Sequence, residues 1–331
     1  MITVSNVSLR YGGRKLFEDV NLKFTPGNCY GVIGANGAGK STFLKILSGD
    51  VEPNTGEVIL APNTRMSVLK QEHNLYDNYQ VLETVIMGNE RLYQIMKEKD
   101  ELYAKPDFSD EDGIRASELE GEFADLNGWE AESEASSLLQ GLGIGTESHY
   151  KMVSELTGAE KVKVLLAQAL FGNPGILILD EPTNHLDLDA IEWLEGYLKE
   201  VKGSIVVISH DRFFLDAITN KTVELLGGRV ETYNGNYTAF IDLKEKNREV
   251  QQKAFDLQQA EIKRQEEIIA RYKSFNREKS IKAAESRQKA LDKMERLDAP
   301  VREAKASRIR FETQIKSGND VLYIENLKKS F

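Results

Sequence analysis

A glycine-rich segment near the start of the chain has the residue types that hold a chain of phosphates. The pattern G-x-x-x-x-G-K-[ST] is matched by Gly34, Ala35, Asn36, Gly37, Ala38, Gly39, Lys40 and Ser41, and the segment ends with Thr42. Glycines let backbone N–H groups curl around phosphate oxygens, Lys40 can reach the β- and γ-phosphates, and Ser41 can offer its hydroxyl to Mg²⁺. The alternative is a glycine-rich turn without a ligand. An apolar run before the segment and a helical pattern after it disfavour that alternative.

Two carboxylates and a histidine follow two other apolar runs. Asp180 and Glu181 stand at the end of the run 175–180, and His210 follows the run 204–209. In a nucleotide site, Asp180 would hold Mg²⁺ through the water shell of the metal, and Glu181 would polarise a water for in-line attack on the γ-phosphate. His210 would then lie near the γ-phosphate. The alternatives are a strand-end charge pair and a structural histidine, and the phosphate-binding segment in the same chain disfavours both.

The elements that must position these residues alternate between strands and helices. Unbroken apolar runs at 29–34, 175–180 and 204–209 are typical of strands that helices cover on both faces. Helical spacing is present at 161–171 and 189–201. The pattern predicts an α/β fold with a mostly parallel sheet as its core.

Two further patterns predict antiparallel strands. Alternating residues up to Leu9 and again at 20–24 indicate an antiparallel patch at the start of the chain. The stretch 223–233, which turns at Gly227 and Gly228, indicates a β-hairpin.

Composition limits the class of protein. The chain has 331 residues, of which 40% are hydrophobic and 29% charged, so it can build a packed core. Its single cysteine, Cys29, excludes an intramolecular disulfide, a multi-cysteine zinc site and an iron–sulfur cluster, and we expect it to be buried on a strand. We find neither an apolar stretch of about 20 residues nor a secretory leader, which predicts a cytoplasmic protein with no membrane partner.

Charge is distributed unevenly along the chain, whose net charge is −10. Residues 88–134 hold 5 Lys or Arg against 15 Asp or Glu, whereas residues 244–316 hold 20 against 13. The net charge alone argues against a nucleic-acid partner. The basic block nevertheless has the charge to contact phosphates.

Further motifs make the chain resemble the ATP-binding cassette family over about residues 1–240. The phosphate-binding segment is followed in order by Gln71, the stretch 156–161, the stretch 180–187 and His210. This is the family's order of phosphate loop, Q-loop, signature, magnesium carboxylate with catalytic glutamate, D-loop and switch histidine. The resemblance implies ATP hydrolysis with Mg²⁺ as a cofactor. It also implies a nucleotide-binding core, an antiparallel β patch and a helical subdomain.

The resemblance implies roles for single residues. Gln71 would bind the nucleotide and, together with Ser41 and Asp180, the metal ion. Glu181 and His210 would be catalytic.

Two implications concern the surroundings of the nucleotide. Tyr11 stands at the place of the aromatic residue that stacks on adenine. Cassettes of this family work in pairs, so that each ATP lies between one phosphate loop and the signature of the other cassette.

The signature departs from the family pattern Leu-Ser-Gly-Gly-Gln/Glu. It contains Thr157, Gly158, Ala159 and Glu160, so threonine replaces the serine and alanine the second glycine. Ala159 adds a β-carbon where backbone should approach the γ-phosphate, and a positive φ there would cost about 1 kcal/mol. We therefore expect a weaker or slower site at the ATP of the partner cassette.

Segments outside these motifs resemble the ABC-F branch, whose members are translation factors without membrane domains. Residues 88–134, with helical patterns at 90–103 and 114–127, look like the arm inserted in a first cassette at 1–242. Residues 243–316 look like the helical hairpin that links two cassettes. The resemblance implies an ATPase that acts on the ribosome and whose linker contacts tRNA. The acidic arm would suit a basic protein surface better than RNA.

The linker pattern predicts two antiparallel helices with a narrow apolar seam and a basic tip. Two stripes flank a break at 274–280, and they consist of Phe255, Ile262 and Ile269, then Ala284, Leu291, Met294 and Leu297. Basic side chains interleaved with Tyr272 and Phe275 suit contact with RNA phosphates and bases, and a solvated charged face is the alternative. The candidate RNA-binding residues are Arg271, Lys273, Arg277, Lys279, Lys282, Arg287 and Lys289.

The last ten residues repeat the first predicted strand. Residues 322–331 parallel residues 2–11 at an offset of 320, and Asn326 matches Asn6. We therefore expect residues 317–331 to begin a second cassette, which would make the chain the first part of a tandem protein.

Two other functions stay open. One is the ATPase subunit of a membrane ABC transporter, which leaves the hairpin at 244–316 unexplained. The other is a DNA-repair or chromosome ATPase. In those with long coiled coils, hundreds of residues separate phosphate loop and signature, whereas Gly34 and Thr157 are 123 positions apart here.

Overall fold

The computed structural model describes residues 1–72, 74–274, 278–297 and 322–329, and the chain divides into the units Met1–Val250 and Gln251–Phe331. Within the described residues, we find no helix that is both long and apolar enough to cross a membrane.

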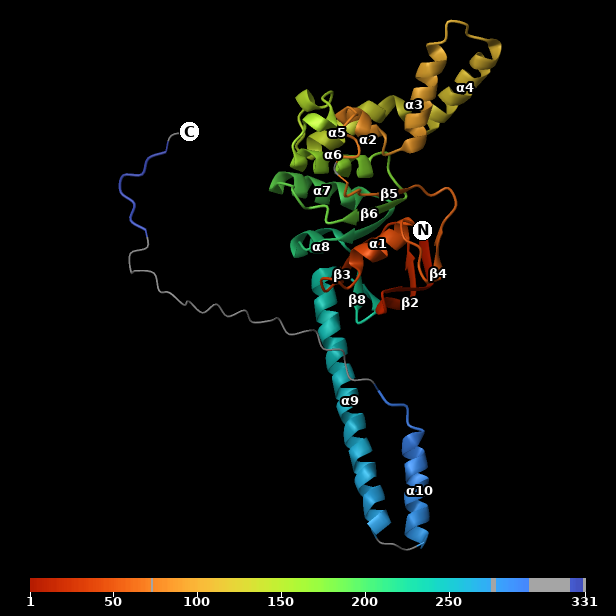
Figure 1. The fold of residues 1–331 in the computed structure, drawn as a ribbon, viewed down its shortest axis with the longest axis vertical. Coiled ribbons are helices and arrows are strands. Elements are labelled where there is room, and N and C mark those ends of the chain that lie inside the picture. The colour runs from red at the N-terminus through yellow and green to blue at the C-terminus, as the bar shows by residue number, and fades with distance from the viewer. Residues whose placement is uncertain (73, 275–277, 298–321, 330–331) are drawn as a thin grey trace. The chain divides into compact units, whose positions relative to one another are not determined.

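A six-stranded sheet forms the centre of the first unit, in the order β5-β6-β7-β3-β8-β9 (Figure 1). The strands are β3 (Cys29–Gly34), β5 (Met66–Val68), β6 (Ile176–Asp180), β7 (Ser204–Ile208), β8 (Lys221–Leu226) and β9 (Arg229–Asn234). Neighbouring strands are parallel except β9, which pairs with β8 as an antiparallel hairpin. Both faces are covered, because Ile176 and Ile178 pack into one core cluster and Leu177 and Leu179 into the other. The predicted α/β fold with a mostly parallel core is confirmed.

A second, antiparallel sheet has the order β2-β1-β4. Its strands are β1 (Ile2–Tyr11), β2 (Arg14–Phe24) and β4 (Thr55–Leu60), and the sequence patterns did not predict β4. Helix α1 (Lys40–Ser48) buries Phe43 and Leu47 in the core cluster that also contains residues of both sheets. The two sheets therefore hold α1, and with it the phosphate-binding segment, between them.

The core cluster on the other face of the large sheet extends from the sheet into a group of helices, some of which lie beyond the sheet (Figure 1). They are α2 (Val81–Ile86), α5 (Ala131–Gly141), α6 (Gly158–Leu170), α7 (Leu188–Glu200) and α8 (Arg212–Ile218), with short 3₁₀ turns at Gly128–Glu130, Thr146–Ser148 and Val153–Glu155. Cys29 is buried in this cluster, as expected, and burial raises the pKa of its thiol to about 12.

Helices α3 (Glu90–Tyr103) and α4 (Asp110–Asp125) form an antiparallel pair that extends away from α2 and α5 (Figure 1). The helix predicted at 114–127 starts four residues earlier, at Asp110, because Ser109 and Asp112 form a capping box. The Lys105 ammonium and the bonds from Ser109 lower the pKa of Asp112 to about 2. Two helices are therefore present where the patterns predicted them, the second of them tightly capped, and their role as an inserted arm stays a prediction.

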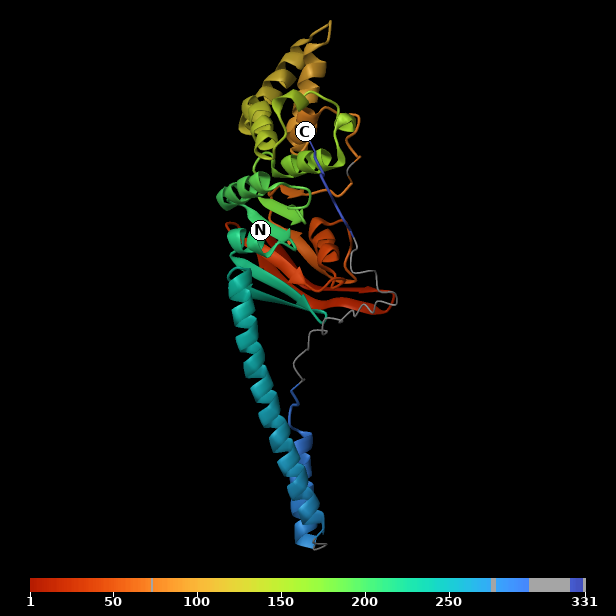
Figure 2. The ribbon, with the colours of Figure 1, turned by 90° about the vertical axis from the view of Figure 1, so that its left-hand side faces the viewer.

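The second unit is built on a helical hairpin, whose helices run side by side in Figures 1 and 2. They are α9 (Tyr237–Ser274), which begins in the first unit, and α10 (Glu278–Asp292). The seam consists of Ile262, Ile269, Ala284 and Leu291, all of which were predicted, whereas Phe255 is half-buried and lies outside this cluster. The expectation for Met294 and Leu297 was wrong: their exposed fractions are 36% and 46%, because α10 ends before them.

Residues 322–329 form neither helix nor strand, and the rest of 317–331 lies outside the described residues. The second cassette expected there stays a prediction.

Candidate functional site

The phosphate-binding segment forms a tight loop between β3 and α1 that needs its glycines. Gly37 and Gly39 have φ angles of 77° and 98°, in the left-handed region that side chains disfavour. A β-carbon on Gly34 would lie 2.7 Å from the carbonyl oxygen of Leu225, too close for either backbone to accept. Gly39 caps α1, so the unpaired N–H groups of the first helical turn face the loop. This loop can therefore hold anionic oxygens.

The Lys40 ammonium lies folded over this loop. Its Nζ donates to the carbonyl oxygens of Gly34 and Ala35 at 2.9 and 3.4 Å. The positive charge is thus held at the mouth of the loop, next to the N-terminus of α1.

Gln71 and Asp180 meet although they are 109 residues apart. The Gln71 Nε2 donates to Asp180 Oδ2 at 2.9 Å. Asp180 is the last residue of β6, and Gln71 follows β5, the parallel neighbour of β6. The sheet topology therefore brings the predicted Q-loop residue to the predicted magnesium carboxylate.

Glu181 and His210 form a second pair at the same edge of the sheet. The His210 backbone N–H donates to Glu181 Oε2 at 3.1 Å, and His210 Nε2 lies 3.4 Å from Glu181 Oε1. Glu181 itself has a φ of 53°, held by donation from its backbone N–H to the Ile208 carbonyl at 2.9 Å. Among the described residues other than Gly, Asn and Asp, positive φ occurs only at Glu181 and His185. Strain of this kind concentrates at functional sites.

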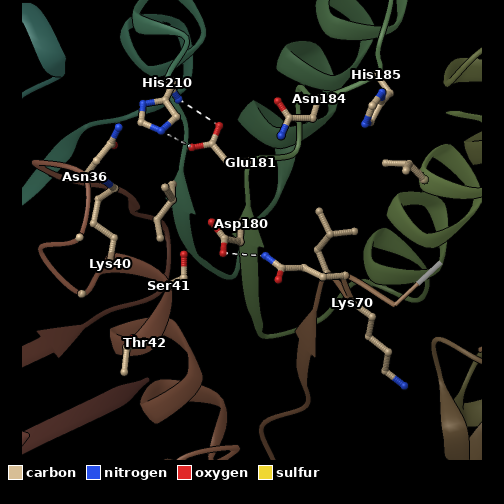
Figure 3. A pocket seen from close by; sticks show the side chains of 16 residues that line it. Asn36, Lys40, Ser41, Thr42, Lys70, Asp180, Glu181, Asn184, His185 and His210 are labelled. Carbon is tan, nitrogen blue, oxygen red and sulfur yellow. Dashed lines mark hydrogen bonds and ion pairs between the residues drawn. The ribbon is translucent and has the colours of Figure 1, made fainter. Parts of the chain in front are cut away.

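These groups surround one cavity of about 710 Å³, and Figure 3 shows Lys40, Ser41, Asp180, Glu181 and His210 gathered around it. The lining residues are Asn36, Gly37, Gly39, Lys40, Ser41, Thr42, Leu69, Lys70, Gln71, Val162, Asp180, Glu181, Asn184, His185, Ile208 and His210. Gly34, Ala35 and Ala38 belong to the loop without lining the cavity. Tyr11 ends β1, is 55% exposed and lies outside the lining, so its adenine-stacking role stays a prediction.

The signature forms the start of α6 and lies outside this cavity. Thr157 caps the helix in a capping box with Glu160, whose Oε2 accepts from the Thr157 backbone N–H at 2.8 Å. That bond and the Thr157 hydroxyl lower the pKa of Glu160. Ala159 lies in the first turn with no positive φ, so the conformational penalty considered for it does not arise. The difference of Ala159 from the family's second glycine is therefore only its added β-carbon.

Six of the seven candidate RNA-binding residues lie on the described helices α9 and α10. Those with exposed side chains are Arg271, Lys273, Lys282, Arg287 and Lys289. Arg277 and the side chain of Lys279 lie outside the described residues, as does Phe275. Tyr272 packs against the apolar seam, half-buried, with the Arg287 guanidinium 6.0 Å from its ring centre. Tyr272 is therefore less available for base stacking than the sequence pattern suggested.

Comparison with known proteins decides the family. Residues 17–184 match a family model described as ABC transporter, and residues 223–311 match a second model with the same description. The chain belongs to the ABC transporter family. Its first unit is a cassette of this family, and two relatives that are ABC transporter F family members of Arabidopsis thaliana support the ABC-F resemblance of the sequence motifs.

Three relatives show the extent of the match, which covers 100% of this chain in each case. The uncharacterized ABC transporter ATP-binding protein YkpA of Bacillus subtilis is 54% identical, and the probable ATP-binding protein YbiT of Escherichia coli O157:H7 is 41% identical. ABC transporter F family member 5 of Arabidopsis thaliana is 32% identical. The chain spans 61%, 62% and 49% of their respective lengths.

Solved structures agree with the cassette fold. A dimeric bacterial ABC transporter cassette matches 71% of this chain and 98% of its own, with a TM-score of 0.51 and 23% identity. At this identity the likeness establishes the fold alone.

ABC cassettes bind ATP, normally with Mg²⁺, and the residues of this cavity fit that ion. Ser41, Asp180 and Gln71 present a hydroxyl, a carboxylate and an amide, the oxygen donors that Mg²⁺ prefers. Because Asp180 is the only carboxylate among these three residues, water and phosphate oxygens would complete the coordination of Mg²⁺. Within the part of the chain that the structure describes, no group of three or more His, Cys, Asp and Glu side chains could hold a metal by itself.

Three polar side chains of the cavity were not among the predicted site residues. Asn184 and His185 line it from the turn after Glu181, together with Lys70 from the loop before Gln71. Because these residues are close in sequence to Glu181 and Gln71, the sequence could have indicated that they line the same cavity.

Proposed function

We propose that the cassette binds MgATP in the Lys40 cavity. The loop N–H groups and Lys40 would hold the β- and γ-phosphates, and Ser41, Gln71 and Asp180 would hold Mg²⁺. When bound, Mg²⁺ neutralises charge that develops on the phosphate oxygens. The observation that carries the proposal is the convergence of the loop, the Gln71–Asp180 pair and the Glu181–His210 pair on one cavity.

Glu181 is the proposed general base. It would accept a proton from a water as the water oxygen bonds to the γ-phosphorus and the bond to the bridging oxygen of ADP breaks. The His210 N–H, which donates to Glu181 Oε2, fixes the direction of the carboxylate. The His210 side chain is 68% exposed, and its ring would face the γ-phosphate.

A second cassette would complete this site. The signature Thr157–Glu160 does not line the cavity of its own cassette, and the positive end of the α6 dipole at the signature would attract an anion held by a partner cassette. Two exposed apolar side chains, Leu188 at 83% and Phe213 at 88%, stand at the starts of α7 and α8 beside the site. Docking of a second cassette would cover them.

Ribosome association is the proposed cellular role, in the cytoplasm and with tRNA contacted by the basic hairpin of residues 243–316. The ABC-F relationship supports it, as do the exposed basic side chains at the end of α9 and on α10.

Co-sedimentation of the full-length gene product with ribosomes tests this role. Pelleting that depends on nucleotide state and weakens with salt is expected, because phosphate contacts release counterions. Equal absence from the pellet with ATP, a non-hydrolysable analogue and ADP would contradict a ribosomal role and favour a transporter ATPase.

A further inference from the structure

Helix α6 contains two lysines that are almost fully buried. Lys161 and Lys163 are only 9% and 8% exposed, which is rare for lysine unless its charge is paired. Both lie within the first two turns of α6, directly after the signature. None of the roles proposed above uses them.

Lys161 is bonded to the loop that carries Gln71. Its Nζ lies 2.5 Å from Asp77 Oδ1 and 3.2 Å from Asn74 Oδ1. Both acceptors follow Gln71 on the segment between β5 and α2. Any displacement of this loop would therefore act directly on α6.

Lys163 is bonded to the opposite loop of the cavity. Its Nζ donates to Asp187 Oδ2 at 2.8 Å, and Asp187 Oδ1 accepts from the Ala190 N–H to cap α7. Asp187 closes the turn that begins at Glu181 and carries Asn184 and His185.

The two lysines point to different sides of the helix. Residues two apart on an α-helix are about 200° apart around its axis. The start of α6 is thus tied to one loop of the nucleotide cavity by Lys161 and to another by Lys163. The far end of α6 is fixed separately, since Arg65 donates to the Phe171 and Gly172 carbonyls.

We propose that Lys161 and Lys163 are positioning residues that couple occupancy of the Lys40 cavity to the orientation of the signature at the start of α6. The inference rests on the proposed MgATP site, because a ligand that engages Gln71 or Asp180 must alter the bond between them. The displaced loop then moves α6 through the bond between Asp77 and Lys161. The bond between Asp187 and Lys163 transmits movement of the turn after Glu181 to α6 in the same way. Occupancy of one site would thereby prepare the signature that serves the other.

Hydrogen–deuterium exchange of the chain, with and without MgATP, tests this coupling. In the wild type, MgATP should slow exchange of the amides at 158–163 by at least threefold. Two charge-removing variants, Asp77→Asn and Asp187→Asn, keep the side-chain shape, and asparagine still caps α7. Each should bind MgATP with affinity within threefold of the wild type and lose most of the slowing at 158–163.

Lys163→Met should lose the slowing as Asp187→Asn does, whereas Lys163→Arg should retain it. Lys199→Met, at an exposed position of α7, is the matched control. A purely structural role would change exchange equally in both nucleotide states. Variants that bind MgATP and retain the full slowing, or wild type that binds without slowing, would overturn the coupling alone. Wild type that fails to bind MgATP would overturn the proposed function as well.

Discussion

Arg65 joins three segments of the cassette, and its replacement is the sharpest test of the packing described above. The guanidinium donates to the carbonyl oxygens of Gly88, Phe171 and Gly172 at 2.7, 2.6 and 2.6 Å. Burial lowers its pKa, and Glu134, which accepts from the Gly172 N–H, opposes this shift. Methionine at this position would fill similar space but satisfy none of the carbonyls.

The expected loss follows from those bonds. Hydrogen bonds from a charged donor contribute roughly 1.5–3 kcal/mol each, but these carbonyls are only partly buried, so water can replace some of the loss. We take about 1 kcal/mol for each carbonyl and expect Arg65→Met to lower the free energy of unfolding by about 3 kcal/mol. For a unit of this size, that corresponds to a fall in melting temperature of about 6–12 °C.

Calorimetry or thermal circular dichroism measures the shift. Arg115→Met is the matched control, because Arg115 bonds to the half-exposed carboxylate of Glu98 and the exposed one of Glu118, which water can solvate in its place. It should leave the melting temperature within about 2 °C of the wild type. Arg65→Lys should fall between the two, since an ammonium lacks the planar fork. Equal melting temperatures for Arg65→Met and Arg115→Met would refute the argument.

Three other predictions concern the site and its support. Glu181→Gln should keep ATP affinity within about threefold and reduce turnover at least about 100-fold; unchanged turnover would remove Glu181 as the base. Gly39→Ala should lower stability by about 1 kcal/mol, because φ is 98° there, whereas Gly196→Ala in open space on α7 should not destabilise; the reverse order in urea denaturation would contradict the loop geometry. Burial raises the pKa of Cys29 to about 12, so its neutral thiol stabilises the fold below about pH 8.5, and this contribution is lost as the pH rises towards 12. At pH 9 the native thiolate population should be about three orders of magnitude below the unfolded one, and rapid native labelling by iodoacetamide would show that Cys29 is not buried.

Local patterns predicted much of the fold. The strand at 29–34 and the first arm helix at 90–103 match β3 and α3 in both bounds. The signature helix was predicted only from Lys161, yet Thr157 and Glu160 have the capping-box spacing that sets its start. That signal was in the sequence.

Other features depend on tertiary packing and leave no local trace. Gln71 and Asp180 meet only because β5 and β6 are neighbours, and Arg65 reaches a carbonyl 107 residues away. The positive φ of Glu181 is imposed by its bond to the Ile208 carbonyl on the next strand. The seam prediction failed at Met294 because apolar spacing cannot show where a helix ends.

Every role proposed for this cassette depends on MgATP binding at the Lys40 cavity. Equilibrium titration of the chain with ATP, with and without Mg²⁺, should show one site that Mg²⁺ strengthens. Lys40→Ala should weaken it at least about tenfold, because the charge held over the loop is lost. Affinity that is independent of Mg²⁺ and unchanged in Lys40→Ala would contradict the assignment of the cavity.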